Sequence, residues 1–219
     1  MSPTTTAGIP IEVHLGPDEW RASLRHEARQ GLLLAEKELP PTWLYDERGC
    51  ELFEEITRLP EYYPTRAERS ILTARADEIA ELARPTVLVE LGAGTAEKTR
   101  ILLGAMRTVQ RYVPFDVAES AVLATADAIA GERPDLDVAG VVGDFRHHIG
   151  SLPTDGRRLI AFLGGTIGNL RPEERSRLLR SVAATMGPGE RRLSKIISAA
   201  SRPAGKPAVR ANHVPHRQS

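Results

Sequence analysis

Residues 87–95 read Val-Leu-Val-Glu-Leu-Gly-Ala-Gly-Thr, and this stretch decides the fold class. A short apolar run is typical of a buried strand, and the two glycines after it let the backbone approach a ligand closely. Residues 96–106 follow with the spacing of a helix. A strand, a glycine-containing turn and a helix in this order predict one unit of a parallel sheet with a ligand at the turn.

The same alternation continues toward the C-terminus. Further strands are predicted at 112–115, 138–142 and 159–163, and further helices at 118–130 and 172–186. Alternating strands and helices at this spacing predict an α/β fold, in which a parallel sheet is flanked by helices. Upstream, apolar residues recur at helical spacing in three segments, 18–34, 46–59 and 65–82.

We therefore expect three parts. Residues 1–84 form an N-terminal helical segment that contributes to the active site, and residues 85–190 form a Rossmann-like core. Residues 191–219 hold seven of the 29 basic residues and no acidic residue, so they are expected to form a basic, disordered tail on an acidic body.

Composition excludes several classes of protein. The apolar runs are far shorter than the roughly 18 residues of a membrane span, so we expect a cytoplasmic protein that does not enter a membrane. A single cysteine, Cys50, excludes an intramolecular disulfide. His147 and His148 are interpreted as surface residues, and the other four histidines form no cluster that suggests a metal site.

The turn after residue 91 favours S-adenosylmethionine over a dinucleotide. A dinucleotide fingerprint requires a third glycine at position 97, where this chain has Glu97. Asp116 ends the second strand 24 residues after Gly92, near the spacing at which a carboxylate accepts hydrogen bonds from ribose hydroxyls. Asp144 and Phe145 end the third strand, where they could contact adenine. The alternative is a plain tight turn, with both aspartates capping helices or turns.

Several stretches together resemble the histidine-specific, S-adenosylmethionine-dependent methyltransferases, which make Nα-trimethylhistidine (hercynine) on the way to ergothioneine. The most specific stretch is 56–66, Ile-Thr-Arg-Leu-Pro-Glu-Tyr-Tyr-Pro-Thr-Arg, which general methyltransferases lack. The other matching stretches are 39–46, 90–99, 114–116, 143–145 and 162–170.

The resemblance implies a Rossmann-like class I methyltransferase with S-adenosyl-L-methionine as cofactor and L-histidine as substrate. It implies no metal, and no side chain is assigned to catalysis. The residues that match the family's cofactor contacts are Tyr45, Gly92, Lys98, Asp116, Asp144 and Phe145. The residues that match its contacts to the amino-acid substrate are Tyr62 and Asn169.

The resemblance ends near Glu190. The family continues with further strands and a second domain that supplies most contacts to histidine, whereas the tail of this chain resembles none of that. We expect a frameshift or truncation after Glu190, which would leave the edge of the fourth strand exposed and the C-terminal strands and second domain missing. A cofactor site could survive this loss, but histidine methylation is expected to be weak or absent.

Two other functions remain open. One is a binding module without turnover, which holds S-adenosylmethionine or a partner subunit. The other is a nucleic-acid methyltransferase that uses the basic tail as an electrostatic arm. The second is disfavoured because the tail has no aromatic residue for stacking bases and the body is acidic, so no nucleic acid is expected as partner. The sequence does not predict the oligomeric state.

Overall fold

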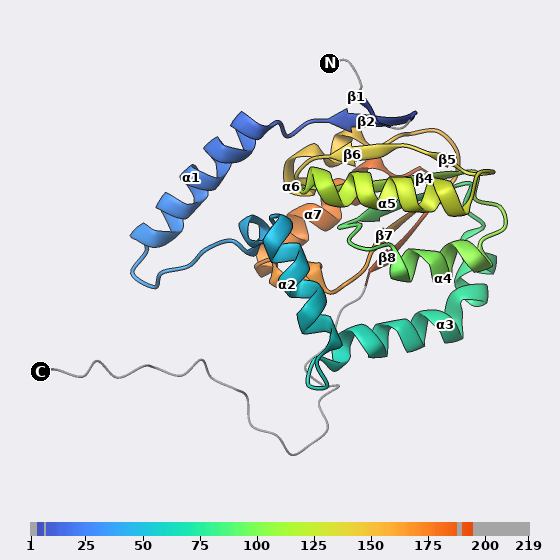
Figure 1. Ribbon diagram of the computed structural model, residues 1–219, viewed down its shortest axis with the longest axis horizontal. Helices are drawn as coiled ribbons and strands as arrows, with labels where there is room; N and C mark the ends of the chain where they lie inside the picture. Colours follow the sequence, from blue (N-terminus) through green and yellow to red (C-terminus); the bar gives the residue numbers. More distant parts are fainter. Residues whose placement is uncertain (1–3, 7, 188–189, 195–219) are drawn as a thin grey trace, which may run out of the picture.

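A computed structural model describes residues 4–6, 8–187 and 190–194 of the chain (Figure 1). It confirms the predicted Rossmann-like α/β fold. One sheet has the strand order β1-β2-β6-β4-β3-β7-β8, and β5 pairs with β4 beside this path. The strands are β1 Thr4–Thr6, β2 Ile9–Val13, β3 Val87–Leu91, β4 Arg111–Asp116, β5 Asp137–Val138, β6 Gly140–Val142, β7 Arg158–Phe162 and β8 Arg191–Ser194.

Helices lie on both faces of this sheet (Figure 1). The α-helices are α1 Pro17–Leu33, α2 Glu47–Arg58, α3 Tyr63–Ala83, α4 Glu97–Ala105, α5 Glu119–Glu132, α6 Phe145–His148 and α7 Pro172–Thr185. Short 3-10 helices are η1 Pro41–Leu44, η2 Ile149–Ser151 and η3 Thr166–Asn169. The first three α-helices correspond to the three helical segments predicted upstream of the sheet.

The central strand β3 is buried on both faces because it pairs in parallel with β4 and with β7. Its side chains alternate between two cores. Leu88 belongs to a cluster built with residues of α3, α4 and α5, and Val89 belongs to a cluster built with residues of α6 and α7. A strand covered on both faces needs a nearly continuous apolar run, which is why residues 87–91 predicted it correctly.

We expected residues 1–84 to form a helical segment, but this segment is not wholly helical. Its residues 9–13 form β2, which pairs in parallel with β6 and places Ile11 opposite Gly140. A Cβ at Gly140 would lie 2.6 Å from Cδ1 of Ile11 and 2.5 Å from Cγ1 of Val122. Glycine therefore allows β2 to pack against the sheet, a long-range fit that the short Ile-Pro-Ile-Glu-Val segment does not reveal.

The prediction that the edge of β7 is exposed is also wrong, because β8 pairs with β7 in parallel. Arg158, a buried residue of β7, donates through Nε to Oε1 of Glu190 at 2.7 Å and so fixes the start of β8. The tail predicted from 191 was misjudged over its first four residues, since an edge strand tolerates polar side chains such as Arg191 and Arg192. The rest of the predicted tail, 195–219, lies outside the described residues.

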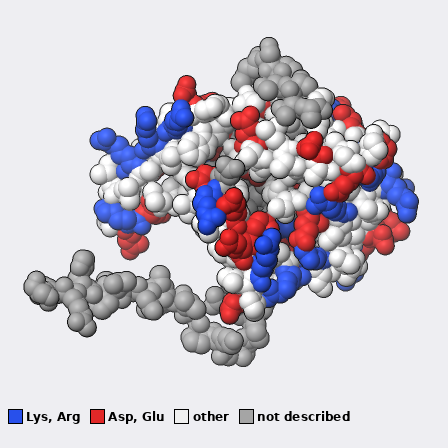
Figure 2. All heavy atoms as spheres, viewed as in Figure 1, with Lys and Arg blue, Asp and Glu red and all other residues white. Residues whose placement is uncertain are grey.

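Charges of both signs are interspersed on the face shown in Figure 2. Basic side chains follow α1, where exposed Arg21, Arg25 and Arg29 are spaced four residues apart. Among the described residues on this face, basic side chains are therefore interrupted by acidic ones. Of the helices in the described ranges, none combines the length and apolar character that crossing a membrane requires.

Candidate active site

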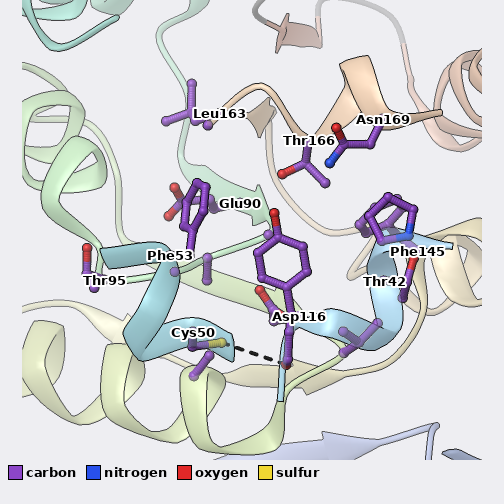
Figure 3. Close-up of a pocket in the computed structure, with 18 of the residues that line it drawn as sticks. Thr42, Cys50, Phe53, Glu90, Thr95, Asp116, Phe145, Leu163, Thr166 and Asn169 are labelled. Atoms are coloured by element: carbon purple, nitrogen blue, oxygen red, sulfur yellow. Dashed lines mark hydrogen bonds between the residues drawn. The ribbon is translucent and has the colours of Figure 1, made fainter. Parts of the chain in front are cut away.

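A cleft of about 770 Å³ lies at the carboxyl ends of the central strands (Figure 3). Its walls include the loop after β3, the end of β4, the first turns of α4 and α5, the start of α6, the loop after β7, and residues 38–57 of the N-terminal segment. Ligands of open parallel sheets bind at this end of the strands. The cleft thus lies where the sequence predicted a cofactor.

The turn after β3 is held in a shape that exposes its backbone. Gly92 and Gly94 have φ values of 77° and 52°, in the left-handed region that favours glycine. The N–H of Gly92 donates to the carbonyl of Phe115 at 2.8 Å, and the carbonyl of Gly94 accepts from the Thr125 hydroxyl at 2.6 Å. These contacts fix the turn as one wall of the cleft.

Asp116 ends β4, and its side chain lines the same cleft (Figure 3). Burial raises the pKa of the Asp116 carboxyl group above its ordinary value. Hydrogen bonds from backbone N–H groups, led by that of Ala118 at 3.0 Å, oppose this shift without cancelling it. The N–H groups of Gly94 and Ala93 act in the same direction. Asp116 therefore caps a turn, as the alternative interpretation proposed, and also presents a carboxylate to the cleft.

Asp144 and Phe145 have different positions. Phe145 lines the cleft and packs edge-on against Phe162, with ring centroids 5.0 Å apart. Asp144 is not among the described residues that line the cleft. Its buried carboxylate accepts from the guanidinium of Arg146 at 2.6 Å, and Arg146, which does line the cleft, also contacts Glu27 at 3.0 Å. The carboxylate of Asp144 is therefore paired with Arg146 and does not itself line the cleft.

Lys98 lines the cleft from the first turn of α4. Its Nζ donates to the buried carboxylate of Glu68 on α3 at 2.9 Å. The same carboxylate accepts the N–H of Gly164 at 3.0 Å. This contact accounts for a lysine near a helix start, where its charge is unfavourable to the helix dipole.

Tyr45 and Asn169 come together in the cleft, and Tyr62 does not line it. Burial is the largest cause that raises the pKa of Tyr45, and the nearby Tyr62 raises it further. A hydrogen bond with the Asn169 side chain opposes this shift. Tyr62 contacts Phe53 edge-on at 6.0 Å, and Phe53 contacts Tyr45 at 5.7 Å. Tyr62 therefore packs against Phe53, a residue of the cleft wall, without lining the cleft itself.

Sequence reasoning missed Glu90 as a residue of the site. Its buried side chain reaches the cleft and accepts hydrogen bonds from the hydroxyls of Thr99 and Tyr112. Burial raises its pKa to about 7, although both hydrogen bonds oppose the shift. A single carboxylate inside the apolar run 87–91 was the signal that could have identified it.

The histidines near the cleft differ from one another. His147 is exposed as predicted, whereas His148 is half-buried, and its Nδ1 accepts the N–H of Asp144 at 3.0 Å. His148 also stacks on His14, with ring centroids 5.8 Å apart. Within the described ranges, no group of three or more His, Cys, Asp or Glu side chains is arranged to hold a metal ion.

A family model described as "Histidine-specific methyltransferase, SAM-dependent" matches residues 24–195. The chain belongs to this family. It is 50% identical over 185 residues to a histidine N-alpha-methyltransferase of Mycobacterium tuberculosis, with 83% of this chain and 58% of that protein covered. It is 32% identical over 163 residues to "Ergothioneine biosynthesis protein 1" of Schizosaccharomyces pombe, which covers 68% of this chain and 21% of that protein.

Solved structures confirm the fold. A magnesium protoporphyrin IX methyltransferase from Synechocystis, solved with bound SAH, superposes with a TM-score of 0.50 at 12% identity and covers 66% of each chain. Its identity is too low to indicate more than the fold. The chain of this histidine-specific methyltransferase family member spans 58% of the length of its mycobacterial relative.

Proposed function

We propose that this chain binds S-adenosyl-L-methionine in the cleft and transfers its methyl group to the α-amine of L-histidine. The observation that carries the proposal is that one cleft joins the glycine turn and Asp116 to Tyr45 and Asn169. The first pair suits a cofactor with an adenosine, and the second pair offers a hydroxyl and an amide to an amino acid. Family membership and the name of the mycobacterial relative support the choice of histidine.

The residues present fit the cofactor. The carboxylate of Asp116 would accept hydrogen bonds from the ribose hydroxyls, and Phe145 would cover the adenine ring. The ammonium of Lys98 would pair with the cofactor's carboxylate, above a turn in which Gly92 leaves room for the ligand. When bound, the cofactor supplies an electrophilic methyl group on a positively charged sulfur.

The residues of the chain then position the acceptor and exclude water. Methyl transfer needs the lone pair of a neutral amine, so the α-amine must release its proton before it reacts. Asn169 would orient the amino acid together with Tyr45, which the resemblance assigned to the cofactor but which is hydrogen-bonded to Asn169. Phe53 and Leu163 supply apolar surface to the same cleft. Holding the amine and the methyl group in line accounts for rate enhancement without a covalent intermediate.

We further propose that three methyl groups are added in succession to give Nα-trimethylhistidine, hercynine, in ergothioneine biosynthesis. The name of the Schizosaccharomyces pombe relative supports this pathway. The N-terminal segment 1–84 belongs to the site in this proposal because Tyr45 and Phe53 come from it, whereas Asp116, Phe145 and Asn169 come from the core 85–190.

A second candidate is a protein that binds S-adenosylmethionine without turnover. One observation favours it: Asn169, which would contact the amino acid, is exposed. This candidate predicts cofactor binding with no product.

Incubation with S-adenosylmethionine and L-histidine, followed by mass spectrometry of the amino acid, separates the two candidates. The proposed function predicts methylated histidine, with the trimethylated form accumulating. Nα-acetylhistidine, whose amine is blocked, is the control and should remain unmodified. Cofactor bound without any methylated histidine would contradict the proposed transfer and support the second candidate.

A further inference from the structure

Glu68 connects three segments that surround the cleft. It lies on α3, its side chain is buried, and its carboxylate contacts Lys98 Nζ at 2.9 Å and the N–H of Gly164 at 3.0 Å. Lys98 belongs to the helix that follows the glycine turn, and Gly164 opens the loop that carries Asn169. Glu68 is not among the described residues that line the cleft, but Lys98 and Gly164, which it contacts, both line it.

Gly164 sets the direction of the loop after β7 and lies against Lys98. Its φ is 81°, which sets the direction in which the chain leaves β7 and is accessible mainly to glycine. A Cβ at this position would lie 3.3 Å from Lys98 Nζ, so the ammonium lies directly against the start of the loop. A shift of Glu68 would therefore move both Lys98 and the loop that leads to Asn169.

A second ion pair lies beside the first with the charges exchanged. Arg69 of α3 pairs with Glu97 of α4, but both of these side chains are about half exposed, so water screens the pair and it contributes little. The Glu68 and Lys98 side chains are only 4% and 20% exposed. The Glu68–Lys98 pair is thus better shielded from water than the Arg69–Glu97 pair, and its geometry is more closely fixed.

We propose that Glu68 is a positioning residue for both sides of the cleft, a role that rests on the proposed function. An ammonium group has three donor hydrogens. One is directed to Glu68, which fixes the directions of the other two on the cleft side, where a carboxylate of the cofactor would accept them. Through Gly164, the same carboxylate holds the loop that presents Asn169 to the acceptor.

Calorimetric titration with S-adenosylhomocysteine tests the cofactor side of this role. Glu68→Gln keeps the size of the side chain and an oxygen for Gly164 but removes the charge that holds Lys98. We expect binding to weaken about tenfold, the factor that corresponds to one charge-assisted contact of roughly 1.4 kcal/mol. Glu78→Gln, on the exposed face of the same helix and paired only locally with Arg75, is the control and should bind like the wild type.

A double-mutant cycle shows whether Glu68 acts through Lys98. In a Lys98→Met background, Glu68→Gln should cause no further weakening of S-adenosylhomocysteine binding. Additive losses would overturn the proposed role, as would wild-type affinity in Glu68→Gln alone. Circular dichroism of each variant confirms that the chain is folded at the titration temperature.

Chemical labelling supplies a test that needs no cofactor. Lys37 is exposed and serves as an internal reference for an amine-reactive reagent, with peptide mapping to quantify each site. Glu68→Gln should raise the labelling of Lys98 relative to Lys37, and Glu78→Gln should not; an unchanged ratio would overturn the contact. If the labelling of Lys98 rises in Glu68→Gln as expected but the wild-type protein does not bind S-adenosylhomocysteine, the result would instead overturn the proposed function, together with the role of Glu68 in it.

Discussion

The hydroxyl of Tyr112 donates a hydrogen bond of 2.8 Å to the carboxylate of Glu90 inside the sheet. The two residues come from neighbouring strands, β3 and β4, and both are fully buried. A carboxylate in such surroundings is costly to ionise, which is why burial raises the pKa of Glu90 to about 7. The free energy of unfolding should therefore depend on pH through Glu90.

The folded state binds the Glu90 proton more tightly than the unfolded state, whose pKa is near 4.5. The contribution of Glu90 to stability is therefore fully present below about pH 4.5 and is lost as pH rises toward 7. Glu90→Gln cannot ionise, so its free energy of unfolding relative to wild type should rise by about 3 kcal/mol across that window. Urea unfolding of both proteins at several pH values measures this, and a difference that is constant with pH would contradict it.

Asp116→Asn should weaken binding of S-adenosylhomocysteine by about tenfold or more, because a charged acceptor forms hydrogen bonds that an amide replaces poorly. Asparagine keeps an oxygen for the N–H of Ala118, so the turn should be preserved. Isothermal titration calorimetry gives the affinities. Asp127→Asn, on an exposed position of α5, is the matched control. Equal affinities for wild type and Asp116→Asn would exclude Asp116 from the cofactor site.

Glu190→Ala should destabilise the protein because it removes a partner of a guanidinium that is 2% exposed. Breaking a buried ion pair in this way typically costs about 3–5 kcal/mol. The hydrogen bond from Arg158 lowers the pKa of Glu190 to about 2, so this stabilisation is present above pH 4.5 and is lost as pH falls toward 2. Denaturant unfolding at pH 7 tests the loss.

The control for Glu190→Ala is Glu132→Ala, which breaks an exposed ion pair with Arg100 and should change stability little. Hydrogen exchange adds a local readout, since the amides of β8 should lose protection in Glu190→Ala alone. If both variants were equally stable, the anchoring of β8 by Arg158 would be refuted.

The two tyrosines of the site should respond differently to substitution. Tyr45 lines the cleft beside Asn169, whereas Tyr62 packs against Phe53 and does not line the cleft. Tyr45→Phe should therefore lower kcat/KM for histidine by about tenfold, the effect of one lost hydrogen bond in a water-poor site. Tyr62→Phe should have a smaller effect. Steady-state kinetics decide the order, and a larger loss in Tyr62→Phe would show that the family's substrate contact reaches the acceptor directly.

Local sequence patterns predicted the central fold well. The apolar run 87–91 and the glycines after it carry their own structural signal, because a fully buried strand and a tight turn constrain composition strongly. The strands β2 and β8 were missed for the opposite reason. Each is short and polar in part, and each forms only because a distant segment, β6 or β7, offers an edge.

The residues of the site divide in the same way, into those that local patterns predict and those that only contacts between distant segments bring together. Gly92, Asp116 and Asn169 follow strand ends, and the common edge of a parallel sheet brings them together. The pairing of Asp144 with Arg146 and Glu27 was not predictable, because Glu27 lies 119 residues from Arg146 in the sequence. The contact of Glu68 with Lys98 and Gly164 was missed likewise, since it joins three separate segments through one side chain.

The most direct test of the account is calorimetric titration of the 219-residue chain, first with S-adenosylhomocysteine and then, in the same sample, with L-histidine. The proposed function predicts that one equivalent of S-adenosylhomocysteine binds, that histidine then binds to the complex, and that Asp116→Asn weakens the first step. A chain that remains folded by circular dichroism and binds neither molecule would contradict the claim that this cleft is a methyltransferase site.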